Sequence, residues 1–219
     1  TFHFACEFVK RDPANTAEAL DLDPEPLAYG LRKHYPKLKP EQRKRLAIHR
    51  RNVISVSKKK VDVIVANNFS FYIFQERAKL VEYFRAARKS LARNGMFILE
   101  MVGGPGFVEK NKEQRTIKHL GKPLFTYIWD QRSFNPVDRR ALYSIHFRFP
   151  DGSIRKDVFT YDWRIWTIPE VRDALREAGF QDTAVFWETS HRGEATGEFV
   201  RSEKGSNDWT WLCYVSGLA

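Results

Sequence analysis

Three polar residues, Asp21, Asn52 and Asn67, each come just after a short strand-like segment, where they could bind a nucleotide. A carboxylate at the end of a strand can accept hydrogen bonds from both hydroxyls of a ribose, and a carboxamide can pair with the edge of an adenine. Acids and asparagines also cap the helices that follow strands, so each residue alone fits either role. Their succession along the chain favours the nucleotide site.

Aromatic side chains in the second half could form a second site. Tyr127 and Trp129 share one face of a predicted strand, as do Tyr161 and Trp163, and Trp166 follows closely. Together they could hold a flat or cationic small molecule by stacking and cation–π contact. Cross-strand packing within an antiparallel sheet is the simpler interpretation of the same spacing.

Proton transfer from a hydroxyl or protonated amine would require a base. The candidate side chains are His3, Tyr72, Tyr127 and His146. His146 alternates with Ser144 and Arg148, so we expect its ring to face solvent.

The pattern of residues 61–104 predicts a strand–helix–strand unit, and Asn67 follows its first strand. Residues 61–66 form an apolar, β-branched strand, residues 75–93 have helical periodicity, and residues 96–99 form a second buried strand. We expect Asn94 and Gly95 to end the helix as a C-cap. A strand, a crossover helix and a second strand form a right-handed parallel unit that binds ligands beyond the carboxyl ends of its strands.

The first 60 residues predict further parts of such a sheet. We expect a helix over residues 1–10 with Phe4, Phe8 and Val9 on one face, and strands over residues 16–21 and 46–48. Asp23 is expected to cap the intervening helix, with Pro24 at its first position.

In the second half of the sequence, apolar and polar residues alternate, as they do in the strands of an antiparallel sheet. Strands are predicted at residues 124–129, 141–149 and 154–161, within an insertion of about 122–164 that would form a lid over the crevice. A capping box at Thr167 begins a helix that Gly179 ends. Finally, residues 183–187 and 209–215 are expected to pair as an antiparallel edge hairpin, joined by a polar loop over residues 190–207.

Composition restricts the class of protein. The 219 residues carry 37 basic and 27 acidic side chains, a formal charge of 37 − 27 = +10, which suits a polyanion partner but also merely favours solubility. Cys6 and Cys213 have neither zinc-like spacing nor a disulfide pattern, so we expect a reduced, cytoplasmic protein. No apolar run approaches the roughly 20 residues that span a bilayer.

The order of these features resembles the class I S-adenosylmethionine-dependent methyltransferases over most of the chain. The matching segments are ALDLDPE at 19–25, NV at 52–53, DVIVANNFS at 62–70, LARNGMFI at 91–98, WTIPE at 166–170 and AGF at 178–180. The family's Gly-rich loop after its first strand is not in this sequence. Thr1 and Phe2 match the tail of that loop, so we expect further residues upstream of Thr1.

The resemblance implies a single domain over residues 1–219: a three-layer α/β sandwich with a doubly wound, mostly parallel seven-stranded sheet, an antiparallel C-terminal hairpin and the small antiparallel insertion. It further implies an enzyme that transfers a methyl group directly from S-adenosylmethionine, with no metal, to nitrogen or oxygen of a small molecule. The cofactor contacts that it implies are Asp21 to ribose, Leu22 and Val53 to adenine, Asn52 to the adenine amino group, and Thr1, Phe2, Asn67, Asn68 and Phe69 to the methionine portion.

Other functions remain open. A dinucleotide-dependent oxidoreductase would require Gly-x-Gly-x-x-Gly after its first strand, which residues 103–106 do not supply. An RNA methyltransferase, or a non-catalytic nucleotide- or RNA-binding module, could use the basic segment 32–60, although such charges more often solvate a surface. The proline-containing motif of base-amino methylases is absent after Asn67. A homodimer is a further expectation, and membrane binding is not expected.

Overall fold

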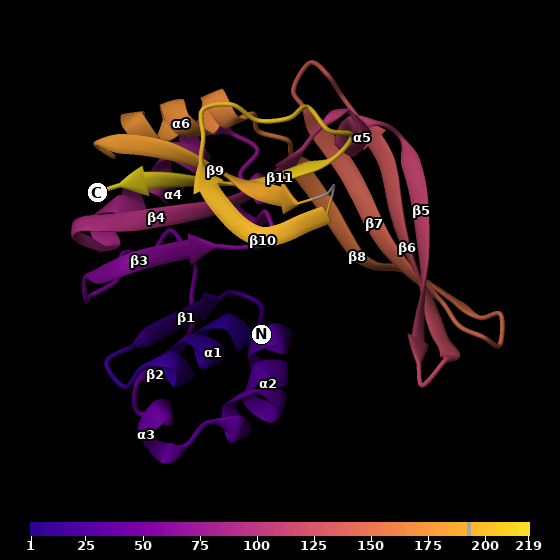
Figure 1. Cartoon of the computed structure of the whole chain (residues 1–219), viewed down its shortest axis with the longest axis horizontal. Helices are drawn as coiled ribbons and strands as arrows, with labels where there is room; N and C mark the ends of the chain where they lie inside the picture. The colour runs from indigo at the N-terminus through magenta and orange to yellow at the C-terminus, as the bar shows by residue number, and fades with distance from the viewer. Residues whose placement is uncertain (192–193) are drawn as a thin grey trace. The chain divides into compact units, whose positions relative to one another are not determined.

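The computed structural model describes residues 1–191 and 194–219, which form two compact units, 1–58 and 59–219 (Figure 1). Each unit has its own hydrogen-bonded sheet structure, and each is described separately below.

The first unit is a small parallel α/β element. Its elements are α1 (His3–Arg11), β1 (Ala17–Asp21), α2 (Pro24–Lys33), the 3₁₀ helix η1 (Tyr35–Lys37), α3 (Pro40–Arg43) and β2 (Leu46–Arg50). β1 and β2 are parallel, with Asp21 opposite Arg50. Asp23 caps α2 by accepting a hydrogen bond from the Glu25 amide at 2.9 Å, as predicted.

The buried face of α1 differs from the prediction. Cys6 and Val9 are buried in the core of this unit, whereas Phe4 and Phe8 are 61% and 41% exposed. Cys6 and Val9 are three residues apart and so share a face, which the helix turns toward Leu46 of β2. The size of the phenylalanines suggested the opposite face, but the small side chains allow the helix to pack closely.

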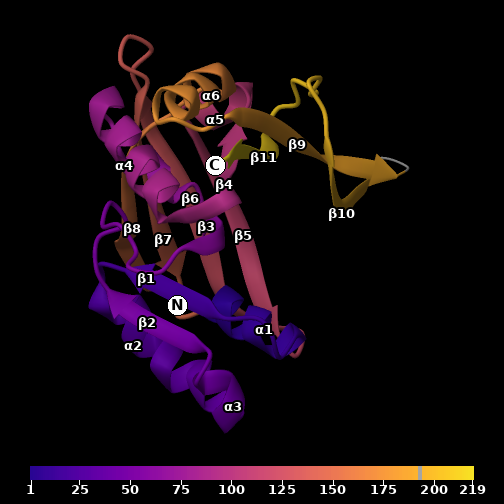
Figure 2. The same ribbon diagram turned by 90° about the vertical axis from the view of Figure 1, so that its left-hand side faces the viewer.

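The second unit contains a five-stranded mixed sheet in the order β10-β9-β11-β4-β3. Its elements are β3 (Val61–Ala66), the 3₁₀ helix η2 (Ser70–Ile73), α4 (Arg77–Ser90), β4 (Leu91–Gly103), α5 (Pro105–Val108), α6 (Ile168–Glu177), β9 (Asp182–His191), β10 (Glu194–Arg201) and β11 (Trp211–Leu218). β3 and β4 are parallel, and the other pairs are antiparallel. The two long helices α4 and α6 contact each other (Figure 2).

These pairings confirm an α/β fold with an antiparallel C-terminal hairpin but not a continuous, mostly parallel seven-stranded sheet. β11 pairs with both β9 and β4, so the predicted hairpin is not at the edge. The edge strand next to β9 is β10, which lies within residues predicted to be a loop. Its glycine, Gly197, lies at a bulge rather than in a turn between elements. The part of the predicted loop at Arg192 and Gly193 lies outside the described residues.

The end of α4 also differs from the prediction. The helix ends at Ser90, and β4 begins at once with Leu91. Asn94 adopts a left-handed backbone with φ +61° inside β4, where the pairing with β3 shifts register between Val61 and Val63. The Asn-Gly pair therefore forms a strand bulge instead of a helix cap, which requires the same backbone conformation.

A separate antiparallel sheet follows α5. Its strands are β5 (Asn111–His119), β6 (Lys122–Phe134), β7 (Arg140–Arg148) and β8 (Ile154–Arg164), in chain order (Figure 1). The three predicted strands are confirmed. β5 was not predicted because its residues are almost all polar, as suits an exposed edge strand. The single-domain organisation stays a prediction.

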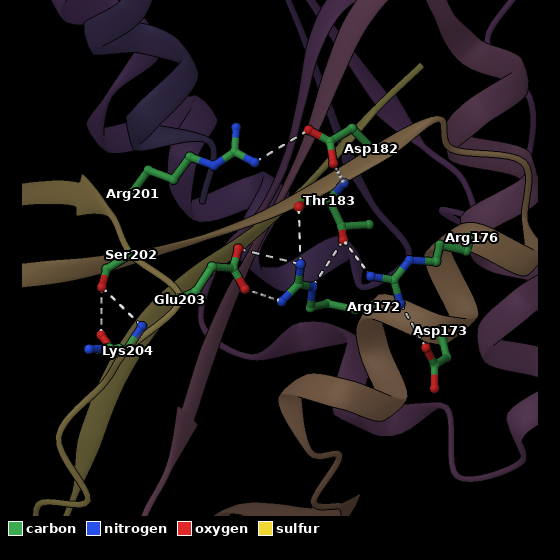
Figure 3. Close-up of polar contacts among 9 residues, drawn as sticks. All are labelled: Arg172, Asp173, Arg176, Asp182, Thr183, Arg201, Ser202, Glu203 and Lys204. Atoms are coloured by element: carbon green, nitrogen blue, oxygen red, sulfur yellow. Dashed lines mark hydrogen bonds and ion pairs between the residues drawn. The ribbon is translucent and has the colours of Figure 1, made fainter.

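The amino end of α6 has the predicted capping box, in which Thr167 and Glu170 bond reciprocally. Further along, Arg172 binds Glu203 at 2.6 Å and the Thr183 hydroxyl at 3.0 Å (Figure 3). This cluster joins α6 to β9 and to the segment after β10. No helix among the described residues is long and apolar enough to cross a membrane.

Candidate functional site

Asp21 and Asn52 lie at the same edge of the β1–β2 sheet. Asp21 is the last residue of β1. Asn52 comes two residues after Arg50, which is the last residue of the neighbouring strand β2. Each makes a local turn, since Asp21 Oδ1 accepts from the Asp23 amide at 3.1 Å and Asn52 Oδ1 accepts from the Ile54 amide at 3.1 Å. Within the described chain, Asp21 Oδ2 has no hydrogen-bond or ion-pair partner. The carboxylate therefore stabilises its turn and still has one oxygen available.

Two apolar side chains accompany these polar groups. Leu22 is 61% exposed and Val53 is 39% exposed, directly after Asp21 and Asn52 in the chain. An exposed leucine and valine can cover the face of a flat ring, and a free carboxylate oxygen can accept hydrogen bonds from hydroxyls. These are the positions for which the sequence predicts contacts with adenine and ribose.

Thr1 and Phe2 lie against α2. The Thr1 carbonyl and the Phe2 ring would approach a Cβ on Gly30 to 2.3 and 2.5 Å, so only glycine allows this contact. Phe2 has a left-handed backbone with φ +45°, and its carbonyl accepts from the Cys6 amide at 3.1 Å. These two residues form a fixed turn before α1.

The turn after β3 is strained. Asn68 and Phe69 have φ values of +55° and +54°, which for a bulky phenylalanine costs about 1–3 kcal/mol. Glu100 of β4 holds this turn, because its Oε2 accepts from the Asn68 amide and its Oε1 accepts from the Tyr214 hydroxyl at 3.4 Å. Such strain is common where a backbone is shaped for a ligand. Sequence reasoning missed Glu100, whose only signal is a single acid within an apolar strand.

The strained turn contacts an aromatic wall on the antiparallel sheet. Phe69 meets the Trp163 ring edge-on with centroids 6.3 Å apart, and Trp163 continues to Tyr161 at 4.5 Å. Tyr161 in turn lies 6.0 Å from Trp129. Tyr127 and Trp129 share a face of β6, with Phe147 and Ile145 opposite them on β7. The predicted aromatic residues of β6 and β8 are therefore brought together with Phe69.

Tyr143 is a member of this wall that the sequence did not single out. Its ring stacks on Trp129 at 5.2 Å and lies 5.7 Å from Trp163, and its hydroxyl donates to the Phe107 carbonyl at 2.8 Å. Trp166 lies elsewhere: it is buried, its Nε1 donates to the Phe74 carbonyl at 3.0 Å, and the Arg164 guanidinium covers its ring at 3.7 Å.

The candidate bases have different surroundings. Tyr72 is fully buried, its hydroxyl donates to the Val102 carbonyl at 2.7 Å, and burial raises its pKa well above the ordinary value. Burial, followed by the neighbouring Tyr161, also raises the pKa of Tyr127. Both phenols are therefore protonated at neutral pH. His3 is exposed on α1, 3.6 Å from Glu7.

His146 does not face solvent, contrary to the prediction. It is buried on the face of β7 opposite the aromatic wall, where Nε2 lies 3.2 Å from Asp130 and Nδ1 accepts from the Asp157 amide at 2.8 Å. Ion pairs from Lys112 and Arg132 to those two aspartates cover it. The alternation of residues along β7 predicted the correct face of the strand for His146, but it did not predict that these ion pairs bury the ring. Burial opposes ionisation of Asp130, yet hydrogen bonds from Lys112 and His146 lower its pKa.

Residues 1–191 and 194–219 contain no cluster of three or more His, Cys, Asp or Glu side chains that could hold a metal ion. No family model matches the chain, and no curated protein matches its sequence.

The chain has the fold of the class I S-adenosylmethionine-dependent methyltransferases, as comparison with solved structures shows. An S-adenosylmethionine-dependent methyltransferase from Clostridium acetobutylicum ATCC 824 matches with a TM-score of 0.65 at 16% identity, over 93% of this chain and 75% of that one. The CcbJ methyltransferase from Streptomyces caelestis gives 0.66 at 13% identity, over 92% and 74%. CalS10, an amino pentose methyltransferase from Micromonospora echinaspora involved in calicheamicin biosynthesis, gives 0.65 at 16% identity, over 99% and 81%.

Proposed function

We propose that this chain is an S-adenosylmethionine-dependent methyltransferase that acts on nitrogen or oxygen of a small-molecule acceptor. The observation that carries the proposal is Asp21, whose Oδ2 is unpaired within the described residues and whose neighbour Leu22 is an exposed apolar side chain. These groups fit a nucleoside, since the carboxylate can accept from ribose hydroxyls and the leucine can cover an adenine face. The fold is the second support.

The bound cofactor would supply a methyl group on a positively charged sulfur. In this proposal Asp21 holds the ribose, Leu22 and Val53 pack against adenine, and Asn52 bonds the adenine amino group through its carboxamide. The residues proposed to lie along the methionine portion are Thr1, Phe2, Asn67, Asn68 and Phe69. The Asn68–Phe69 turn is already fixed by Glu100, so little entropy would be lost when it binds a ligand.

The aromatic wall is the proposed acceptor surface. Tyr127, Trp129 and Tyr161 are partly exposed, whereas Trp163 is buried beneath Phe69. A half-exposed row of rings can stack a flat acceptor or attract a cationic one, and it excludes water from the reacting atoms. Positioning and desolvation supply most of the acceleration in a direct transfer, so no base need be assigned.

The ribose assignment can be tested with a matched pair of ligands. S-adenosylhomocysteine and its 2′-deoxy analogue are titrated into the full chain, into Asp21→Asn and into the control Asp23→Asn, which retains the helix cap. We expect Asp21→Asn to weaken S-adenosylhomocysteine at least tenfold, about 1.4 kcal/mol, and to lose the preference for the 2′-hydroxyl. Equal discrimination by wild type and Asp21→Asn would refute the assignment.

The alternative, an RNA-binding module, has one specific support. Arg45 donates to three backbone carbonyls and Arg51 pairs with Glu18, so both have structural roles. The basic segment also has exposed lysines with no salt bridge to a carboxylate among the described residues, seven in all: Lys33, Lys37, Lys39, Lys44, Lys58, Lys59 and Lys60. Binding through them would weaken steeply as salt rises, whereas the methyltransferase proposal predicts no such RNA binding. The cytoplasmic location and the homodimer stay predictions.

A further inference from the structure

A hollow of about 370 Å³ lies where β4 ends and α6 begins, in the second unit. Its walls are mainly apolar and include Ile165, Trp166 and Trp211, together with Asn207 and Gly104. A volume of this order accommodates a small organic molecule. Trp166, which the sequence suggested for the aromatic wall, belongs to this hollow instead.

Arg139 is the one ionisable side chain among the described residues that line the hollow. Its Nε donates to the Ile165 carbonyl at 2.7 Å, and its own carbonyl accepts from the Ile165 amide at 2.9 Å. The guanidinium also lies 5.6 Å above the Phe134 ring. In residues 1–191 and 194–219 neither Nη group has a hydrogen-bond partner, and no carboxylate pairs with this arginine.

The backbone conformation of Arg139 also indicates a functional role for this position. Its φ is +58°, a left-handed conformation that glycine or asparagine adopts more readily than arginine. The two hydrogen bonds to Ile165 offset the strain of this conformation and fix both the backbone and the side chain of Arg139. The neighbouring Arg140, by contrast, is exposed and paired with Asp162 at 2.7 Å. Of these two neighbouring arginines, Arg139 is the one whose side chain is fixed in place and has no carboxylate partner within the described residues.

We propose that this hollow is a binding site for a small organic carboxylate. A fixed guanidinium with two free Nη groups matches the geometry of a carboxylate, and the tryptophan and isoleucine walls match an apolar body attached to it. The single positive charge selects a monoanion over a multiply charged phosphate ester. Apart from Trp166, which lies outside the aromatic wall, the site uses none of the residues assigned to cofactor or acceptor, so it does not depend on the proposed function.

Benzoate is a suitable probe, with neutral benzamide as its isostere. Binding to the full chain is followed by the fluorescence of the tryptophans and by calorimetry. We expect benzoate to bind at least tenfold more tightly than benzamide, and Arg139→Gln to abolish that difference. The control Arg140→Gln removes a charge of equal sign one residue away and is expected to bind benzoate as wild type does.

A second variant guards against misfolding of Arg139→Gln, which also loses the bond to Ile165. Val108 lines the hollow from α5, so Val108→Trp should fill it while leaving Arg139 untouched. We expect this variant to lose benzoate binding at least tenfold with its melting temperature retained. Equal affinity for benzoate and benzamide, or unchanged benzoate affinity in folded Val108→Trp, would overturn the proposal.

Discussion

The substitution Tyr72→Phe, which removes the phenolic hydroxyl, tests whether Tyr72 has a structural or a catalytic role. Its side chain is fully buried, and its ring meets Phe71 and Trp163 edge-on at 4.8 and 5.9 Å. The hydroxyl donates to the Val102 carbonyl at 2.7 Å and accepts from the Val102 amide at 3.3 Å. Tyr72→Phe keeps the ring contacts and removes both hydrogen bonds.

The expected loss follows from the groups left behind. Removing one partner from a buried polar group costs about 1–3 kcal/mol, because the remaining group stays desolvated. For a chain of 150–250 residues each kcal/mol lowers the melting temperature by about 2–4 °C. Tyr72→Phe should therefore melt roughly 2–12 °C below wild type.

Thermal unfolding followed by circular dichroism measures this difference. The matched control is Tyr127→Phe, whose hydroxyl has no hydrogen-bond partner among the described residues and whose loss should change stability by less than about 0.5 kcal/mol. A Tyr72→Phe protein that melts with wild type would show that the hydroxyl does not stabilise the turn after β3. In that case the phenol would have to be reconsidered as a group that acts on a ligand.

Two further predictions concern stability. Burial raises the pKa of Tyr83 and Tyr143 above the ordinary 10.0, so the folded state favours the neutral phenols. Their contribution to the denaturant midpoint should be constant below about pH 10, and the midpoint should fall above that pH; a midpoint unchanged between about pH 10 and pH 11 would contradict this. Arg172→Gln should destabilise by about 1–3 kcal/mol because it removes the shorter of the two bonds to the buried Thr183 hydroxyl and leaves it only the contact with Arg176 at 3.5 Å. Arg176→Gln, at a more exposed position, should cost under about 1 kcal/mol, and equal losses would argue against this difference.

Local signals explain which elements could be predicted from the sequence. The Asp23 cap, the capping box at Thr167 and the apolar strand over residues 61–66 each depend on neighbours within a few positions, and all three are confirmed. The methyltransferase fold was likewise predictable, because the order of strands and polar ends is set along the chain.

Features that depend on distant partners could not be predicted. β5 and β10 are polar edge strands that exist because β6 and β9 offer them hydrogen bonds. His146 is buried by ion pairs from β5, β6 and β8, which no local pattern reports. For the candidate site, the sequence indicated the aromatic residues of β6 and β8, but not Tyr143 between them or Glu100 behind the turn. Both act through contacts with residues more than 30 positions away.

Calorimetric titration of the full chain with S-adenosylhomocysteine tests the central claim most directly, namely that the edge bearing Asp21 binds a nucleoside cofactor. We predict saturable binding of one molecule per chain, weakened at least tenfold by Asp21→Asn and competed by S-adenosylmethionine. A folded chain that takes up no S-adenosylhomocysteine at millimolar concentration would contradict the account.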